Sequence, residues 1–161
     1  MKKTRRLPAA LLLIASAALV LGAGWAAGSL AAQTAATPLK KDFINPTPGR
    51  FSGAVVVHGN GVKTIYISGH TGRGEDLKTQ AVAAYEGVLR ELTAAGATPD
   101  DVVKLNTYIA NYTPDDRAAY EEAKRKVFPQ VNLPASTMVG VQALISPQNR
   151  IEVEAVAMVR E

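Results

Sequence analysis

The sequence predicts an α+β fold in which two helices pack on one face of a sheet of about five strands. Three observations support this prediction. Beyond residue 42, short stretches alternate apolar and polar residues, which is typical of strands. Two longer stretches repeat apolar residues at helical spacing. Turn-forming residues separate these stretches, in the order strand, strand, helix, strand, helix, strand, strand.

The first two strands are predicted to form a hairpin. The apolar run from Ala54 to His58 ends in Gly59-Asn60-Gly61, a strong signal for a tight turn. The stretch from 63 to 68 follows, with Ile65 and Ile67 on one face.

Two helices are predicted. The first covers 76–95 and ends before Gly96, which can adopt a left-handed conformation. Its apolar stripe contains Leu77, Ala81, Ala84, Val88 and Leu92. The second begins at Thr113-Pro114-Asp115-Asp116, where Thr113 can cap, Pro114 suits the first turn and the acids oppose the helix dipole. Pro129 ends it.

Three further strands are predicted, at 102–109, 135–143 and 151–159. The last strand has one apolar face, made of Ile151, Val153, Ala155 and Ala157. Its other face begins with Glu152 and Glu154 but continues with Val156 and Met158. Because the helices cover only one side of the sheet, we expect another subunit to cover this half-apolar face.

The first 31 residues are expected to form an export signal. Four basic residues precede an apolar stretch from Leu7 to about Trp25, and small residues up to Ala31 suit cleavage there. The alternative is an uncleaved inner-membrane anchor, since the stretch nearly reaches the length of a membrane span. Arg5-Arg6 resembles a twin-arginine signal, but Pro8 favours the Sec route. We therefore expect a periplasmic or secreted protein, with residues 32–41 as a linker and 42–161 as the domain.

Composition argues against nucleic-acid and metal sites. The chain has 18 basic and 14 acidic residues, and four of the basic ones lie in the first 31, so the rest is neutral. A neutral domain offers little to a phosphate backbone. There are no cysteines and two histidines without metal-binding spacing, so neither a thiolate site nor a metal site is expected.

Five segments together resemble the RidA/YjgF family, also called the L-PSP endoribonuclease family. They are Ile65-Tyr66-Ile67-Ser68-Gly69-His70, then 76–80 with 92–96, then Asp101-Val102-Val103-Lys104, then Pro134-Ala135, and finally Ile151-Glu152-Val153-Glu154-Ala155. They occur in the family's order and cover nearly all of the domain.

The resemblance implies a fold like bacillus-type chorismate mutase, with five to six strands. It also implies a homotrimer with clefts between subunits and a small-molecule substrate. Family members hydrolyse reactive enamines and imines to carbonyl products and ammonia without a cofactor. In the family, an arginine after Pro-Ala holds the substrate carboxylate. Ser136 occupies that position here, so the resemblance implies an altered carboxylate clamp.

By this resemblance, Glu152 and Ser68 are the candidate catalytic residues, and Glu152 matches the glutamate that orients water. Alternatively, Glu152 and Glu154 are simply the solvated end of a strand. Candidates for substrate binding are Ser136, Thr137, Arg73, His70, Gly69, Phe51 and Ala135.

Several of these candidates have a structural alternative. Ser136 would otherwise be an ordinary strand residue. Gly69 to Gly74 would otherwise be a glycine-rich turn, although its amides and Arg73 could bind an anion. His70 would otherwise cap that turn. Phe51 stands near the place where the family often has a tyrosine, which is a second departure.

The sequence therefore favours an exported enamine/imine deaminase. The first alternative is a non-catalytic homologue that binds a small metabolite, which the missing arginine favours. RNA cleavage is less favoured because the mature domain has no net positive charge.

Overall fold

The computed structural model describes residues 39–129 and 133–161. The expected export signal and most of the expected linker lie outside the described residues. Leu39–Glu161 forms one compact unit, and no helix in its described part is both long enough and apolar enough to cross a membrane.

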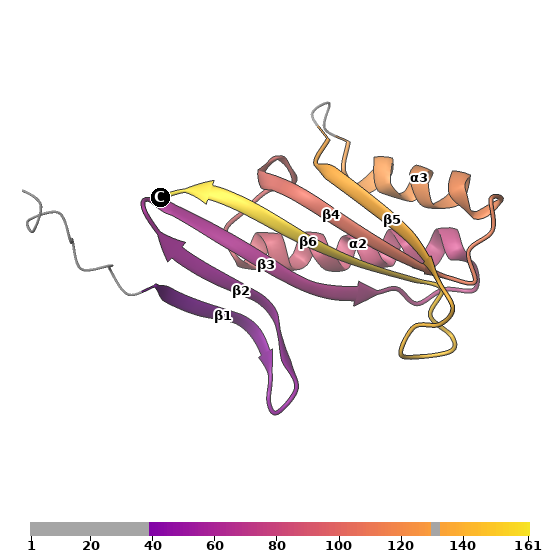
Figure 1. Ribbon diagram of the computed structural model, residues 1–161, viewed down its shortest axis with the longest axis horizontal. Coiled ribbons are helices and arrows are strands. Elements are labelled where there is room, and N and C mark those ends of the chain that lie inside the picture. Colours follow the sequence, from indigo (N-terminus) through magenta and orange to yellow (C-terminus); the bar gives the residue numbers. More distant parts are fainter. Residues whose placement is uncertain (1–38, 130–132) are drawn as a thin grey trace, which may run out of the picture. The chain divides into compact units, whose positions relative to one another are not determined.

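The unit is built on a six-stranded sheet with the strand order β1-β2-β3-β6-β4-β5 (Figure 1). The strands are β1 Lys40–Thr47, β2 Phe51–Gly59, β3 Val62–Thr71, β4 Val102–Ala110, β5 Ala135–Val141 and β6 Ile151–Arg160. β4 and β5 are parallel, and the other neighbours are antiparallel. The α+β prediction is confirmed, and the C-terminal strand β6 lies in the middle of the sheet.

Strand β1 is the element that the residue pattern did not indicate. It lies at the edge of the sheet, pairs only with β2, and begins at Lys40, inside the expected linker. Asn45 has a positive φ of 47° and Pro46 follows, so regular alternation is broken. An edge strand tolerates both features because one of its sides needs no ladder hydrogen bonds.

The predicted hairpin is confirmed and joins β2 to β3. Asn60 and Gly61 have φ values of 54° and 71°, the two positive values that a type I′ turn requires. Both strands run further than predicted, because β2 begins at Phe51 and β3 continues to Thr71.

The first helix, α2, spans Leu77–Ala94, and its predicted stripe is buried. The Asp76 carboxylate caps it by accepting from the Thr79 amide at 2.7 Å, and Gly96 follows with φ 68°. A 3₁₀ turn at Pro99–Asp101 then leads into β4.

The second helix, α3, spans Asp116–Val127 and begins three residues after the predicted cap. The prediction that Thr113 caps it is wrong. Instead, the Thr113 amide donates to the Asp116 carboxylate at 2.8 Å, and Arg150 donates to the same carboxylate at 3.1 Å. These contacts hold residues 113–115 in a turn ahead of the helix.

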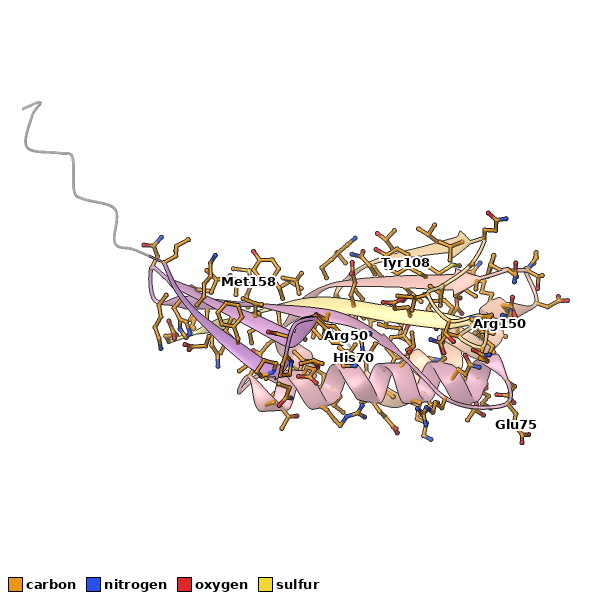
Figure 2. The ribbon with its side chains drawn as sticks, turned by 90° about the horizontal axis from the view of Figure 1, so that it is seen from below. Arg50, His70, Glu75, Tyr108, Arg150 and Met158 are labelled. Carbon is orange, nitrogen blue, oxygen red and sulfur yellow. The ribbon has the colours of Figure 1, made fainter. Side chains whose placement is uncertain are left out.

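Both helices lie on one side of the sheet, as predicted, where Tyr85 of α2 meets Phe128 edge-on with ring centroids 5.8 Å apart. Figure 2 shows Tyr108 and Met158 on the opposite side of the sheet from α2. We call this second side the open face. The first residues of β4 pair irregularly with β6. As a result Val102 is buried and Val103 is exposed, the reverse of the alternation expected for this strand.

Candidate functional site

The acidic pair of β6 lies on the open face. Glu152 stands between Thr71 of β3 and Tyr108 of β4, and Glu154 stands beside Asn106 of β4. The intervening Val153 points into the core and is fully buried. The strand order therefore places both carboxylates in the middle of the sheet, half-buried and flanked by strands on both sides.

Glu152 packs directly against the backbone of Gly69. A Cβ atom added at Gly69 would overlap the Glu152 carboxylate, which would then have to move. Burial, followed by the negative charge of Glu154, raises the pKa of Glu152 above its ordinary value. A carboxylate with a raised pKa is a stronger proton acceptor, which suits a general base.

Glu154 is the better bonded of the two acids. Its Oε1 accepts a hydrogen bond from Nδ2 of Asn106 at 2.9 Å and another from the hydroxyl of Tyr108 at 3.1 Å. The bond to Glu154 raises the pKa of Tyr108. Two hydrogen bonds thus hold the Glu154 side chain in place, whereas none of the described residues donates a hydrogen bond to the Glu152 side chain.

A β-bulge forms the edge of this site. The pairing of β3 with β6 shifts between Ile67 and His70, so that two residues of β3, Ser68 and Gly69, lie opposite the single residue Glu154 of β6. The Ser68 hydroxyl donates to the Ser52 carbonyl at 2.7 Å. The bulge brings Gly69 against Glu152 and turns the next side chain, His70, toward α2.

His70 therefore lies on the helix side of the sheet (Figure 2), because it pairs with the core-facing Val153 and not with a residue of the open face. Its Nε2 is buried, has no hydrogen-bond partner among the described residues, and lies 4.0 Å from Oε1 of Glu91 on α2. Burial lowers the pKa of His70, while Glu91 acts in the opposite direction. Asn45 of β1 donates to the other oxygen of Glu91 at 2.9 Å.

The residues after Pro134 divide between the two sides of the sheet. Ser136 pairs with the buried Leu105 and faces α3, where Nζ of Lys124 donates to its hydroxyl at 3.2 Å. Thr137 pairs with Asn106 on the open face and accepts from Nζ of Lys104 at 2.6 Å. Ala135 is exposed at the start of β5.

Arg73 lies in a separate place, at the rim of a polar cavity of about 570 Å³. The glycine-rich turn after β3, the start of α2 and the loop before β6 line this cavity. Gln80 organises it by donating to the Gly74 and Gln148 carbonyls and accepting from the Arg150 amide. Thr71, which also lines the cavity, pairs with Glu152 in the sheet.

Phe51 begins β2 and is 55% exposed, with the Arg50 guanidinium 5.7 Å from its ring centroid. The open face also carries large exposed side chains, among them Tyr66, Val139 and Met158. In the described ranges, no three His, Cys, Asp or Glu side chains come together in a way that could hold a metal ion.

The structure therefore brings Glu152, Gly69 and the Ser68 backbone together, and it separates them from His70 and Ser136. Asn106 and Tyr108, which bind Glu154, and Lys124 were not among the residues singled out from the sequence. Period-two alternation does place Asn106 and Tyr108 on one face of their strand. It does not indicate that this strand lies next to β6.

Comparison with known proteins identifies similar sequences and folds. The sequence profile described as Endoribonuclease L-PSP matches residues 45–159. A 2-iminobutanoate/2-iminopropanoate deaminase from Dermatophagoides farinae is 34% identical over 132 residues, covering 76% of this chain and 93% of that protein.

Solved structures agree with this match. A YjgF/YER057c/UK114 family member from Mycobacterium tuberculosis superposes with a TM-score of 0.62 at 28% identity, covering 74% of this chain and all of the other. RidA from an Antarctic Psychrobacter gives a TM-score of 0.60 at 27% identity, covering 76% of this chain and 99% of the other. The six-stranded mixed sheet with two helices is the arrangement expected from the sequence resemblance.

Proposed function

The chain belongs to the L-PSP endoribonuclease family, which includes the YjgF and RidA proteins, and on this basis we propose that it hydrolyses small imines or enamines. The proposed products are a carbonyl compound and ammonia. The name of the Dermatophagoides relative, an imine deaminase, supports this substrate class.

The observation that carries the proposal is the position of Glu152. Its carboxylate lies on the open face against Gly69, and burial and the Glu154 charge raise its pKa. In the proposed reaction, Glu152 accepts a proton from a water molecule as the water oxygen bonds to the carbon of a protonated imine. Glu152 then returns this proton to the nitrogen of the resulting carbinolamine. The C–N bond breaks and the nitrogen leaves as ammonia, while the hydroxyl proton passes to solvent and the carbonyl forms. Neither a cofactor nor a redox step is required.

We further propose that the working site lies between protomers of a homotrimer. The exposed Tyr66, Val139 and Met158 share the open face with Glu152, and a neighbouring protomer would cover them. Ser136 and Glu152 belong to opposite sides of one sheet, so a site that uses both positions needs two protomers.

An exported location is part of the same proposal, because residues 1–31 have the layout of a signal peptide. N-terminal sequencing of the protein recovered from the producing cells, together with fractionation, tests it. A mature chain that begins at Ala32 supports export with cleavage. An intact N-terminus in the cytoplasmic fraction contradicts it.

The catalytic proposal is tested by adding the purified protein to imines freshly generated from several amino acids by an amino-acid oxidase. We expect the protein to speed ammonia release above the spontaneous rate. Glu152→Gln should reduce this acceleration by about 10²–10⁴-fold, the usual contribution of a general base. Glu86→Gln, a change of the exposed Glu86 on α2, is the matched control and should have no effect.

If no imine is hydrolysed faster, the deaminase proposal fails. A small metabolite that co-purifies with such an inactive protein would support the alternative of a binding module. That alternative is favoured by Ser136, which offers a hydroxyl where the resembled family has a charged guanidinium.

A further inference from the structure

A lysine and two hydroxyl groups meet at the start of β5. Nζ of Lys124 on α3 donates to the Ser136 hydroxyl at 3.2 Å. Tyr120 lies one turn earlier on the same helix. Burial raises the pKa of Tyr120, and its neighbour Ser136 acts in the opposite direction. A positive charge thus stands beside the position at which the resembled family carries its arginine.

These groups lie beside a small cavity of about 210 Å³, which is lined by Tyr120, Glu121, Lys124, Arg125, Phe128 and Leu133. Pockets for drug-sized ligands usually measure about 300–1,000 Å³, so this one suits a smaller molecule. Phe128 and Leu133 supply an apolar wall, and Lys124 and Tyr120 supply polar groups. This combination fits a ligand with a charged head and a short aliphatic chain.

The charge of the cavity favours an anion. Among the described residues that line the cavity, Glu121 is the one acid. Two arginines neutralise its carboxylate: Arg117 lies 2.8 Å from one oxygen and Arg125 lies 3.7 Å from the other. Lys124 has no carboxylate partner among the described residues, and its bond to Ser136 is to a neutral oxygen. An incoming carboxylate would therefore supply the negative charge that Lys124 lacks.

Lys124 differs in this respect from an ordinary basic residue at a helix end. Such a residue binds the last carbonyls or remains in solvent. Lys124 is half-buried instead and reaches across to a side chain of another element. Because the half-buried ammonium is partly removed from water, the pKa of Lys124 is lowered. Partial desolvation strengthens the attraction to an anion.

We propose that Lys124, with the hydroxyls of Ser136 and Tyr120, is the carboxylate clamp of this protein and binds short-chain 2-oxo and 2-imino acids. The clamp replaces the guanidinium of the resembled family with an ammonium carried by a different element. This inference rests on the proposed function for its role in catalysis, since Glu152 of a neighbouring protomer would act on the bound substrate. Binding of a 2-oxo acid does not depend on that role.

The first experiment measures binding of 2-oxobutanoate to the intact protein by calorimetry. Lys124→Met should weaken binding by about tenfold to a hundredfold, the worth of one charge-assisted hydrogen bond. Lys126→Met is the matched control, because Lys126 is an exposed lysine two residues along the same helix. Lys124→Arg should restore most of the affinity. Thermal melting of each variant checks that it is folded.

Arg73→Met tests the competing clamp at the 570 Å³ cavity. If Arg73→Met abolishes binding while Lys124→Met does not, the inference is overturned. It is also overturned if an uncharged analogue, 2-oxobutanamide, binds as well as the acid. Inorganic phosphate that binds more tightly than 2-oxobutanoate would contradict the proposed ligand class.

The second experiment separates this inference from the catalytic proposal. With imines that carry a carboxylate, Lys124→Met should raise KM. With imines of uncharged amines, it should change neither KM nor kcat. If the protein binds 2-oxobutanoate through Lys124 but hydrolyses no imine, the catalytic proposal fails and the clamp stands. If hydrolysis is normal in Lys124→Met for both substrate types, the clamp fails and the catalytic proposal stands.

Discussion

The carboxylate of Glu152 lies directly against the α-carbon of Gly69, where an added Cβ atom would displace it. The contact joins β6 to the bulge in β3, two segments that lie far apart in the sequence. It gives a physical reason for glycine at this position. Gly69 here serves the placement of a carboxylate rather than an unusual backbone angle, because its φ is not positive.

Gly69→Ala should therefore displace the Glu152 carboxylate and reduce kcat for imine hydrolysis by up to about a hundredfold, because small misplacements of a reacting group are costly. Gly59→Ala is the control, since a Cβ there meets only the end of the flexible Leu39 side chain, at 3.2 Å. Ammonia release measures both variants. Equal activity of Gly69→Ala and the wild type would show that the position of Glu152 is unimportant.

The pH dependence of hydrolysis should reflect the neighbouring acid. A general base works only when deprotonated, so activity should be lost as pH falls through the raised pKa of Glu152. Glu154→Gln removes one of the two causes of that raised pKa. The acidic limb of kcat/KM against pH should then move to lower pH. A limb that stays in place would indicate that Glu152 is not the titrating group.

His70 should make the fold less stable in acid. Its pKa is lowered below 6.5 in the folded protein, so the unfolded chain binds the proton first as pH falls. The free energy of unfolding should consequently fall below about pH 6.5. Its neighbours Glu91 and Arg90 act on the protonated form in opposite directions, and burial is the largest cause.

The test compares urea unfolding of the wild type and His70→Gln at pH 7.5 and at pH 5.5. The wild type should lose more stability between these pH values than the variant, because the variant lacks the titrating ring. Equal losses would mean that the ring titrates alike in the folded and unfolded chains.

Gln80 should contribute to stability through its three hydrogen bonds. It is 5% exposed, and it binds the Gly74 and Gln148 carbonyls and the Arg150 amide. Gln80→Met keeps the volume but leaves these groups unpaired, which should cost about 1–3 kcal/mol. Chemical denaturation measures the loss, with the exposed Gln142→Met as the control. A loss as small as that of the control would mean that water satisfies these groups.

Ser136→Arg should return a guanidinium to the start of β5. We expect it to increase kcat/KM for carboxylate-bearing imines by about tenfold, because arginine binds a carboxylate through two bonds. In the Ser136→Arg background, Lys124→Met should reduce kcat/KM for these imines only slightly. If Lys124→Met reduces kcat/KM as much in this background as in the wild type, the two cations do not bind the same group of the ligand.

Much of the fold follows from local patterns. The Asn60-Gly61 turn, the buried stripe of α2 and the alternation of β6 are each readable from a few neighbouring residues, because backbone geometry imposes fixed periods. Edge strand β1 was not readable in this way. Its alternation is broken at Asn45 and Pro46, and its pairing with β2 supplies the stability that its sequence pattern does not suggest.

The candidate site was readable only in part, because it is made of contacts between distant segments. Glu152 and Gly69 could be singled out from the motifs that contain them. The bonds from Asn106 and Tyr108 to Glu154 depend on β4 lying next to β6. The bond from Lys124 to Ser136 likewise depends on how α3 packs near β5.

The sequence by itself determined the helices and every strand except β1, their order and the family, because these depend on local periodicity and on motifs in register. Only the tertiary structure decided which face each side chain occupies. One bulge turns His70 away from Glu152, and the parallel register of β5 turns Ser136 toward Lys124. A shift of one residue in a strand moves every side chain beyond it to the other face of the sheet. No local pattern in these segments predicts that shift.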